Sequence, residues 1–436
     1  MSIALASALV PVLIIGGVLA ARMPMRALAA YAAVIPFGSG VVIPGPVPPP
    51  FNTLSSLLGV VVSVSLAVDR LRREPGGGRG RSVPSVPVFL LFLSLTLASM
   101  LWSIDRTATA QSLVVLASLM LLFLLAATLQ PTRQQLRELE VAVVVGGTAT
   151  AVFGLWLLFT GSLIATDEAV PRFATAGGGG GVSDPNITAA SLLLPLVLGL
   201  TAVFRSTAPR IRVAATIAAA VTASGIALTG SRGGVAAALV GSLIVVSIER
   251  RPRGLLPWLA GFAVVAAVIL IVTASGVDER LTRSGTTGRS DIWKVGIKTC
   301  SSYCASGSGF GSFSAAYQRE LLRSSDLTGY GLRSFKAHNI WLAMLVESGI
   351  PGLLLGFWGL WLIMTELARL PKRVRGPPTA AMVALLTSNL FLNNLSFKYF
   401  WMVLIYAVLT TRGVEDGRAR GGVPPRTPAP MAASRF

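Results

Sequence analysis

Apolar windows of about 17 to 22 residues recur along almost the whole chain. Each is long enough to cross about 30 Å of hydrocarbon at a helical rise of about 1.5 Å per residue. Of the 436 residues, 53% are hydrophobic and 13% are charged, far more apolar side chain than one soluble core needs. The sequence therefore predicts an all-α polytopic membrane protein, with about 12 to 13 transmembrane helices and a large external loop containing short helices. The windows cover residues 2–21, 28–43, 52–68, 84–103, 111–129, 140–161, 186–204, 211–229, 232–248, 255–275, 338–364, 379–395 and 398–411.

The first two windows are the least regular. Residues 1–21 have the length of a signal peptide, but no positive segment precedes the apolar run and basic residues follow it. A first membrane span is therefore the favoured interpretation. The second window is short and is broken by Pro36 and Gly38.

The basic residues fall in alternate loops between the windows. The net charge of +19 does not indicate nucleic-acid binding, because these residues form no single patch interleaved with exposed aromatics. By the positive-inside rule their loops are cytoplasmic, so the N-terminus and the other loops are external, and residues 412–436 are a disordered cytoplasmic tail. The basic residues concerned are Arg22, Arg26, Arg70, Arg72, Arg73, Arg79, Arg81, Arg133, Arg137, Arg205, Arg210, Arg212, Arg250, Arg251, Arg253, Lys372, Arg373 and Arg375.

The same pattern divides the chain into five parts. Residues 1–161 form an N-terminal transmembrane scaffold, and residues 162–275 form transmembrane helices joined by external turns that carry arginines. Residues 276–337 are the large external loop, residues 338–411 are the C-terminal transmembrane helices, and residues 412–436 are the tail.

The large external loop is cationic on the side of the membrane where positive charge is normally depleted. It holds nine basic and five acidic residues, a net charge of +4, which an anionic ligand would explain. Two short helices are predicted, over residues 290–298 and from Phe313 through Leu321. The glycine-rich turn between them, residues 307–311, is weak support for phosphate binding, because no strand precedes it and no Lys-Ser/Thr pair follows it.

The two cysteines, Cys300 and Cys304, lie in this loop, where oxidation is permitted. A local disulfide and two free thiols on one helix both remain open. One histidine and two cysteines cannot furnish a typical metal site, so no metal and no cofactor is predicted.

Two shorter external turns carry polar candidates. Arg172 and Asn186 flank a glycine run and a helix-start signal, and they either face a polar site or serve as a solvated arginine and a cap. Ser231 and Arg232 lie in a tight turn whose glycines bare backbone N–H groups, so Arg232 either binds an anion bidentately or snorkels beside a hairpin.

The only histidine, His338, begins the window at residues 338–364 and precedes Asn339. On a straight helix Glu347 lies about 180° from His338 and roughly 13 Å along the axis, so the two are not expected to form an acid–base pair. Glu347 and Gly349 are therefore predicted to be structural, with Gly349 and Pro351 offering a kink.

The string His338-Asn339-x-x-Leu342, followed by Glu347-x-Gly349-x-x-Gly352, resembles the signature of the O-antigen ligase and Wzy-type polymerase superfamily. Further matches follow in the family's order, and the resemblance covers roughly residues 170–411. They are Arg172 with Asp184-Pro185-Asn186, Ser231-Arg232-Gly233, Arg289 before Trp293, and Gly307-x-Gly309-x-Gly311-x-Phe313 with Tyr317.

The resemblance implies an integral membrane glycosyltransferase that uses a polyprenyl-diphosphate-linked glycan, with Arg232, Arg289 and His338 as the catalytic residues. Arginines that grip phosphate oxygens would stabilise the charge growing on the diphosphate leaving group. His338 would take a proton from the acceptor hydroxyl, giving a metal-independent, inverting displacement. The candidate substrate-binding residues are Arg172, Asn186, Ser231, Tyr317 and Asn339.

The expected location is the bacterial plasma (inner) membrane, with the active site on the external or periplasmic face. The expected partners are the lipid-linked donor, a glycan, lipid or protein acceptor, and membrane lipids. The alternative is a transporter or flippase of an anionic lipid-linked solute. Against that alternative, the polar candidates gather at one face and no matching interrupted spans suggest inverted repeats. Asn389, Asn393 and Asn394 in the twelfth window are the exception, and they are also suited to hydrogen bonding between helices.

Overall fold

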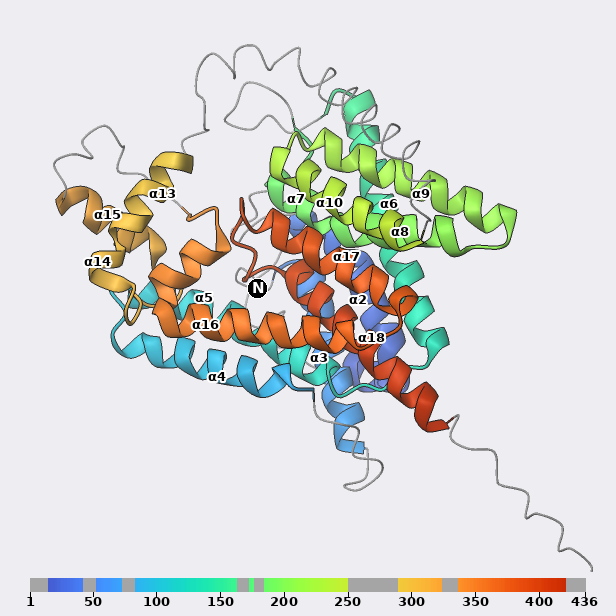
Figure 1. The fold of residues 1–436 in the computed structure, drawn as a ribbon, viewed down its shortest axis with the longest axis horizontal. Coiled ribbons are helices and arrows are strands. Elements are labelled where there is room, and N and C mark those ends of the chain that lie inside the picture. The colour runs from blue at the N-terminus through green and yellow to red at the C-terminus, as the bar shows by residue number, and fades with distance from the viewer. Residues whose placement is uncertain are drawn as a thin grey trace, which may run out of the picture.

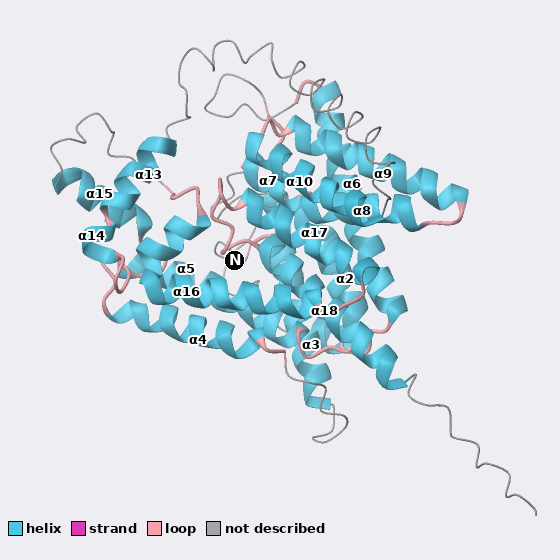
Figure 2. Cartoon of the chain, in the orientation of Figure 1, coloured by secondary structure: helices cyan, strands magenta, loops and turns pink. Residues whose placement is uncertain are grey.

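The computed structural model describes residues 15–41, 52–72, 83–162, 172–175, 184–249, 289–323 and 336–420, and within these ranges it contains no β-strand. Figures 1 and 2 show an all-helical bundle, which confirms the predicted fold class. Seven described helices are long and apolar enough to cross a membrane. The predicted window at residues 255–275 and the glycine run near residue 180 lie outside the described residues.

The N-terminal half is built from α2 (Pro24–Val34), η1 (Ile35–Gly40), α3 (Leu54–Arg72), α4 (Ser85–Ala98), η2 (Ser99–Leu101), α5 (Arg106–Ala126) and α6 (Arg133–Phe159). The second predicted window does break where expected, because α2 ends at Val34 and Pro36 lies in a 3₁₀ turn. Small residues allow close packing in this scaffold: a methyl group on Gly146 of α6 would collide with the backbone of Ala33 in α2.

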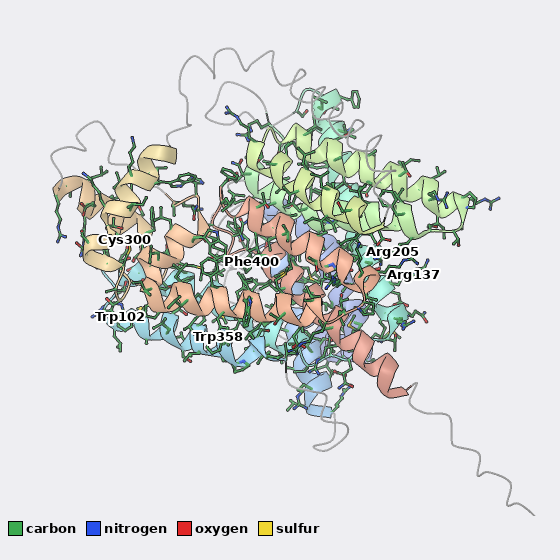
Figure 3. The ribbon with its side chains drawn as sticks, in the orientation of Figure 1. Trp102, Arg137, Arg205, Cys300, Trp358 and Phe400 are labelled. Carbon is green, nitrogen blue, oxygen red and sulfur yellow. A yellow bond between two sulfur atoms is a disulfide. The ribbon has the colours of Figure 1, made fainter. Side chains whose placement is uncertain are left out.

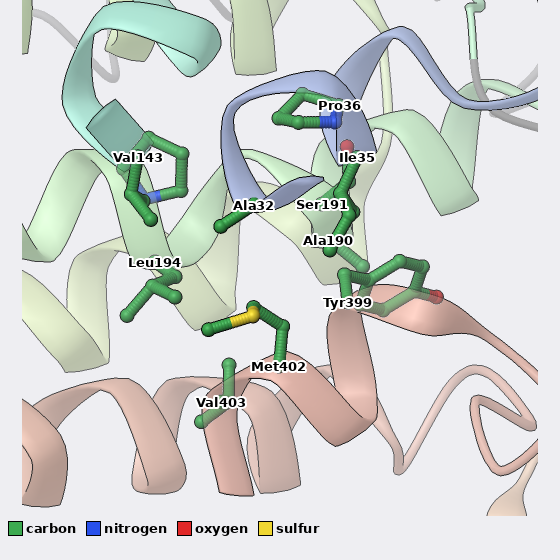
Figure 4. Close-up of a pocket in the computed structure, with 11 residues that line it drawn as sticks. Ala32, Ile35, Pro36, Val143, Ala190, Ser191, Leu194, Tyr399, Met402 and Val403 are labelled. Carbon is green, nitrogen blue, oxygen red and sulfur yellow. The ribbon is translucent and has the colours of Figure 1, made fainter. Parts of the chain in front are cut away.

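The middle of the chain contributes α7 (Pro185–Ser191), α8 (Leu193–Arg205), α9 (Pro209–Leu228) and α10 (Arg232–Glu249). The apolar stretch Pro185–Arg205 is 89% buried, against 33% for α9 and for α10, so α7 and α8 form the centre of the bundle. A small pocket beside this centre is lined mainly by apolar groups, among them Pro36, Leu194 and Met402 (Figure 4). None of the candidate site residues lines it.

Beyond residue 288 the chain forms α13 (Arg289–Lys298), α14 (Cys300–Tyr303), α15 (Phe313–Arg323), α16 (Ile340–Ala368), α17 (Lys372–Ser388) and α18 (Lys398–Arg420). The two short helices predicted in the large loop are confirmed as α13 and α15. Two window ends were wrong: α17 stops at Ser388 rather than at residue 395, and α18 continues to Arg420 through residues assigned to a disordered tail.

The bundle has two chemically different ends. Arg137 and Arg205 lie at one end, here called the arginine end, whereas Trp102 and Cys300 lie at the opposite end beside α13, α14 and α15 (Figure 3). The second end is here called the α13–α15 end. Arg205 is fixed to Glu249 by a salt bridge of 2.6 Å. Arg137 and Arg205, which belong to two of the basic loops, thus lie away from the short helices.

Candidate active site

Helix α16 does not run straight through the bundle, as the window at residues 338–364 suggested; it folds back on itself at Gly349. Gly349 has φ 69° and ψ −176°, outside the helical region. The ring of Trp341, before the break, stacks on Phe357, after it, with centroids 4.2 Å apart. Met344 likewise contacts the backbone at Gly356. Residues 340–348 therefore lie against the second half of the same helix.

A glycine is required at the point where α16 folds back, at position 349. Its φ of 69° with ψ of −176° lies in a region that essentially only glycine adopts, and a residue with a Cβ there is strained by about 1–3 kcal/mol. A Cβ at this position would also lie 2.8 Å from the carbonyl oxygen of Ala305 and 2.8 Å from the nitrogen of Gly307. The predicted kink is confirmed, and its cause is the close approach of the chain segment after α14.

That segment, residues 304–312, is here called the clasp because it holds both sides of the break. Ile350 donates its N–H to the Cys304 carbonyl at 2.8 Å, and Ser308 donates to the Val346 carbonyl at 2.8 Å. Gly309 donates to the backbone carbonyl of Glu347 at 3.0 Å. The Glu347 side chain, 6% exposed, accepts the Gly311 N–H through Oε2 at 3.0 Å.

The clasp is held on its other side by the connection between α4 and α5. Ile104 donates its N–H to the Ser308 carbonyl at 3.0 Å, and the Phe310 N–H reaches the Ser99 hydroxyl at 3.1 Å. The indole of Trp102 donates to the Ser306 carbonyl at 3.2 Å. The clasp is thus wedged between the start of α5 and the break in α16.

The backbone N–H groups of the glycine-rich turn are all used in hydrogen bonds to the rest of the protein. Within the clasp, Gly307 donates to Tyr303 and Ser312 donates to Gly309, so all six N–H groups from residue 307 to residue 312 are bonded. A phosphate-binding loop needs N–H groups that point at the ligand. In this arrangement the turn is a packing element.

The structure forms a disulfide between Cys300 and Cys304, the first of the two states that the sequence left open. The bond closes one turn around α14 directly before the clasp. Cys304 is 7% exposed and belongs to a small apolar cluster with α13, α15 and the start of α16.

His338 sits at the returning end of α16 in a constrained backbone. Its φ is 47°, the only positive φ of a non-glycine residue in the part of the chain that the structure describes. Asn339 follows as the N-cap, and its Oδ1 accepts the N–H groups of Trp341 at 2.9 Å and Leu342 at 3.0 Å. Left-handed backbone at a non-glycine residue is often found at functional sites, because the surrounding structure must hold it there.

The connection between α17 and α18 holds this end in place. Asn339 donates its side-chain Nδ2 to the Leu390 carbonyl at 3.2 Å, and Ile340 donates its N–H to the Asn389 carbonyl at 3.1 Å. The ring of Phe391 packs on Gly233, where a methyl group would lie 3.0 Å away. Residues 389–391, here called the bridge, therefore contact both the His338 segment and the start of α10.

Arg232 is the first residue of α10 and is exposed. The turn before it is made by Gly230, with φ 61°, and by Ser231, which is 2% exposed. The Ser231 hydroxyl accepts the Gly234 N–H at 3.1 Å, so Ser231 caps the helix. The Ser231 cap and the Gly230 turn fix where α10 begins and thereby fix the backbone position of Arg232.

Arg172 joins the same turn from a different part of the sequence. Its Nε donates to the Thr229 carbonyl at 2.7 Å, and its neighbour Phe173 donates to the Leu228 carbonyl at 3.1 Å. Asn186 is the second residue of α7, and Asp184 caps that helix. The side-chain amide of Asn186 donates to the Asp184 carboxylate at 3.1 Å. The structure thus brings Arg172 to the Arg232 turn.

Two further candidates belong to α13 and α15. Arg289 is the first residue of α13, and its side chain lies outside what the structure describes. One turn later, Trp293 donates its indole N–H to the carbonyl of Ala337, the residue before His338, at 3.1 Å. Tyr317 is 1% exposed in the cluster with Ile292 and Phe313, so its ring lies in a core.

The bridge is the part of the site that sequence reasoning missed. The apolar pattern predicts one span over residues 379–395 and leaves two roles open for its asparagines, polar groups of a site or hydrogen bonds between helices, whereas the helix ends before Asn389. The available signal was the polar group Asn389, Asn393 and Asn394 in an otherwise apolar window, since polar backbone turns interrupt spans only where protein surrounds them.

Comparison with known families supports the motif-based resemblance. Residues 217–357 match the family model described as O-Antigen ligase, a stretch that contains Arg232, Arg289, His338 and the α16 break. No curated protein matches the chain. The resemblance to the O-antigen ligase and Wzy-type family is thereby confirmed for this stretch.

Proposed function

We propose that this chain, which carries an O-antigen ligase domain at residues 217–357, transfers a glycan from a polyprenyl diphosphate carrier to an acceptor hydroxyl. The family match supports glycan transfer in polysaccharide assembly at a membrane. The donor, the stereochemistry and the sidedness given below are parts of the proposal.

The observation that carries the proposal is the fold-back of α16 together with the bridge. Without the break at Gly349, the nine residues 340–348 would extend away from the bundle by about 13 Å at helical rise. With it, the segment starting at His338 reaches the bridge, and the bridge packs on the turn of Arg232. The segment that begins at the proposed base, His338, and the helix that begins at the proposed cation, Arg232, are distant in the sequence and both contact the bridge.

The proposed chemistry uses the residues in separate roles. An acceptor hydroxyl attacks the anomeric carbon and gives its proton to His338, while the bond from that carbon to the phosphate oxygen breaks with inversion. The polyprenyl diphosphate leaves with the bonding electron pair. Arg232 and Arg289 hold its growing negative charge, with Arg172 beside them, and no metal is needed for this compensation.

The remaining candidates divide by what their side chains touch. Asn186, together with Arg172, is proposed to contact the donor. Ser231 and Asn339 have their side-chain oxygens in helix caps, and Tyr317 lies in a core. These three are therefore proposed as positioning residues for Arg232, His338 and α13.

The α13–α15 end is proposed to be the external face, because Arg137 and Arg205, from two of the basic loops, lie at the arginine end. The protein would then sit in a bacterial plasma membrane, with the arginine end in the cytoplasm. Residues 1–161 would serve as scaffold, and residues 162–411 would build the site under the external loop at residues 276–337.

The test uses the purified full chain in liposomes with a polyprenyl-diphosphate-linked glycan and an acceptor, measuring release of free polyprenyl diphosphate. His338→Ala is expected to lower turnover by about 10²–10⁴-fold, and Arg232→Gln or Arg289→Gln by about 10²–10³-fold. Lys372→Gln, an exposed change at the arginine end, is the matched control. Scrambling of the lipid between leaflets with its glycosidic bonds unchanged would instead support the transporter alternative.

A further inference from the structure

Lys398, the first residue of α18, lies in a cluster of hydroxyl groups that no motif assigns. Its ammonium donates to the Ser55 hydroxyl at 2.7 Å and the Ser56 hydroxyl at 2.8 Å, with Thr53 at 3.5 Å. Ser55 is fully buried and Thr53 is 6% exposed, whereas Lys398 and Ser56 are partly exposed. Thr53 and Ser55 are therefore covered by the bundle, whereas parts of Ser56 and Lys398 reach its surface.

Among the residues that the structure describes, no carboxylate pairs with the positive charge of this cluster. The Lys398 ammonium forms no ion pair with any residue that the structure describes. The sequence itself lacks aspartate and glutamate throughout residues 26–68 and residues 367–414, which include both flanking segments. Hydroxyl groups solvate the ammonium as neutral dipoles and leave its net charge in place.

The helix geometry adds to this charge. Helix α3 begins at Leu54 and α18 begins at Lys398, so two helix N-termini lie within side-chain reach of one ammonium. Each N-terminus carries roughly half a positive charge, and neither helix has an acidic residue in its first turn. Three positive contributions thus converge on a group of hydroxyls that carries no negative charge of its own.

A purely structural role would be to tie α3 to α18. An uncharged side chain that hydrogen-bonds to Ser55 and Ser56 would make the same tie without the cost of placing a charge at the edge of a membrane bundle. The charge itself is explained if an anion joins the cluster, because an oxyanion accepts protons from both an ammonium and hydroxyl groups.

We propose that Lys398, together with the hydroxyls of Ser55 and Ser56, binds a phosphate group where α3 and α18 begin. Two sources present that chemistry: the headgroup of a bilayer phospholipid, and the phosphate of a phosphorylated substrate. None of these three residues belongs to the proposed catalytic set, and the proposal stands independently of the proposed transfer reaction.

The test observes Lys398 directly in the full chain. The sequence has five lysines, Lys294, Lys298, Lys336, Lys372 and Lys398, so incorporation of ¹³Cε-labelled lysine gives a spectrum with one ε-carbon NMR signal per lysine and leaves each ammonium unaltered. The protein is held in a maltoside detergent, which contains no phosphate. Inorganic diphosphate and short-chain phosphatidylglycerol are titrated separately, and Lys398→Arg identifies the Lys398 signal.

The expected result is a saturable shift of the Lys398 signal that exceeds the shift of the Lys372 signal, the internal control. Ser55→Ala/Ser56→Ala is expected to weaken the apparent affinity about tenfold, because two hydroxyl donors are lost. A response to diphosphate alone assigns a phosphorylated substrate, and a response to phosphatidylglycerol alone assigns a bilayer lipid. A Lys398 signal that moves no more than that of Lys372 with both probes overturns the proposal.

A second measurement needs no isotope label. Native mass spectrometry of the chain extracted from membranes, and of the chain incubated with diphosphate, counts the retained phosphate compounds. Lys398→Gln is expected to lose the retained compound, Lys398→Arg to keep it, and Lys372→Gln to behave like the unmodified chain. Equal retention by Lys398→Gln would contradict a phosphate site at this lysine.

Discussion

The carboxylate of Glu347 accepts the backbone N–H of Gly311 at 3.0 Å, across thirty-six positions of sequence. This contact connects the clasp to the helix residue two positions before the break in α16. The backbone carbonyl of the same residue accepts the Gly309 N–H at 3.0 Å, so both ends of Glu347 hold the glycine-rich turn. The acidic residue nearest the break therefore stabilises the fold-back.

Replacing Glu347 with alanine is expected to lower stability by about 1–3 kcal/mol, because the buried N–H of Gly311 loses its acceptor. Glu347→Gln keeps one oxygen acceptor and should lose less. Thermal unfolding of the detergent-solubilised chain measures both. Glu138→Ala, which removes a partly exposed ion pair with Arg26 at 3.2 Å, is the control and should change stability by about 0–1 kcal/mol. If Glu347→Gln abolished glycan transfer at unchanged stability, the carboxylate would have a catalytic role.

Replacing Gly349 with alanine is expected to open the fold-back, since a Cβ there meets the Ala305 carbonyl at 2.8 Å and the left-handed φ adds strain. The readout is a disulfide between Met344→Cys and Gly356→Cys, whose positions touch only when the two halves of α16 lie together. The bond should form in the chain that keeps Gly349 and fail when Gly349→Ala is added to the same background. Gly199→Ala, where a methyl group would make an ordinary 3.5 Å contact, is the matched control and should leave the bond intact.

These contacts explain which features the sequence could predict. The spans follow from apolar length, and the break at Gly349 follows from glycine and proline within an apolar window. The direction in which α16 continues after the break does not follow from the local sequence. It is set by hydrogen bonds from the clasp, which lies some forty positions earlier. The N–H groups of residues 307–312 similarly look available in the sequence, and only their tertiary partners show that they are used.

Tyr317 and the bridge show the same limit. A helical pattern identifies an apolar face on α15 but not the elements that cover it, and here Ile292 and Phe313 enclose the tyrosine. The Asn389 carbonyl is reached by Ile340 from a helix that the pattern placed in another direction. Local sequence is enough to predict the helices, whereas the arrangement of the candidate site depends on contacts between distant segments.

Asn339 offers a way to separate helix capping from positioning. Asn339→Ala should cost about 1 kcal/mol of stability through loss of the cap. Asn339→Ser keeps a capping oxygen but loses the amide donor to Leu390, which is 3.2 Å away in the native chain. Its stability should therefore stay close to the native value while transfer falls by up to about 100-fold, since the His338 segment keeps only the bond from the Ile340 N–H to the Asn389 carbonyl as its link to the bridge. Equal transfer rates for Asn339→Ser and the native chain would mean that this link does not position His338.

The disulfide should make a modest contribution. A bond that closes so short a loop restricts the unfolded chain by about 2 kcal/mol, so Cys300→Ser/Cys304→Ser should lower the thermal midpoint without abolishing folding. Mass spectrometry after alkylation, with and without reductant, checks the bond itself. Alkylation of both thiols in the unreduced native protein would show that the bond is not formed.

We propose that the fold-back of α16 brings His338 close to Arg232 at one site. The most direct measurement is cross-linking of Arg232→Cys to His338→Cys, in a Cys300→Ser/Cys304→Ser background, with a rigid thiol reagent about 10 Å long, the reach of a diphosphate with its first sugar. An efficient intramolecular cross-link is expected for this pair, and no cross-link is expected between Arg137→Cys at the arginine end and His338→Cys. Failure of the 232–338 pair to cross-link, while both cysteines still react singly with a small thiol reagent, would contradict a shared site.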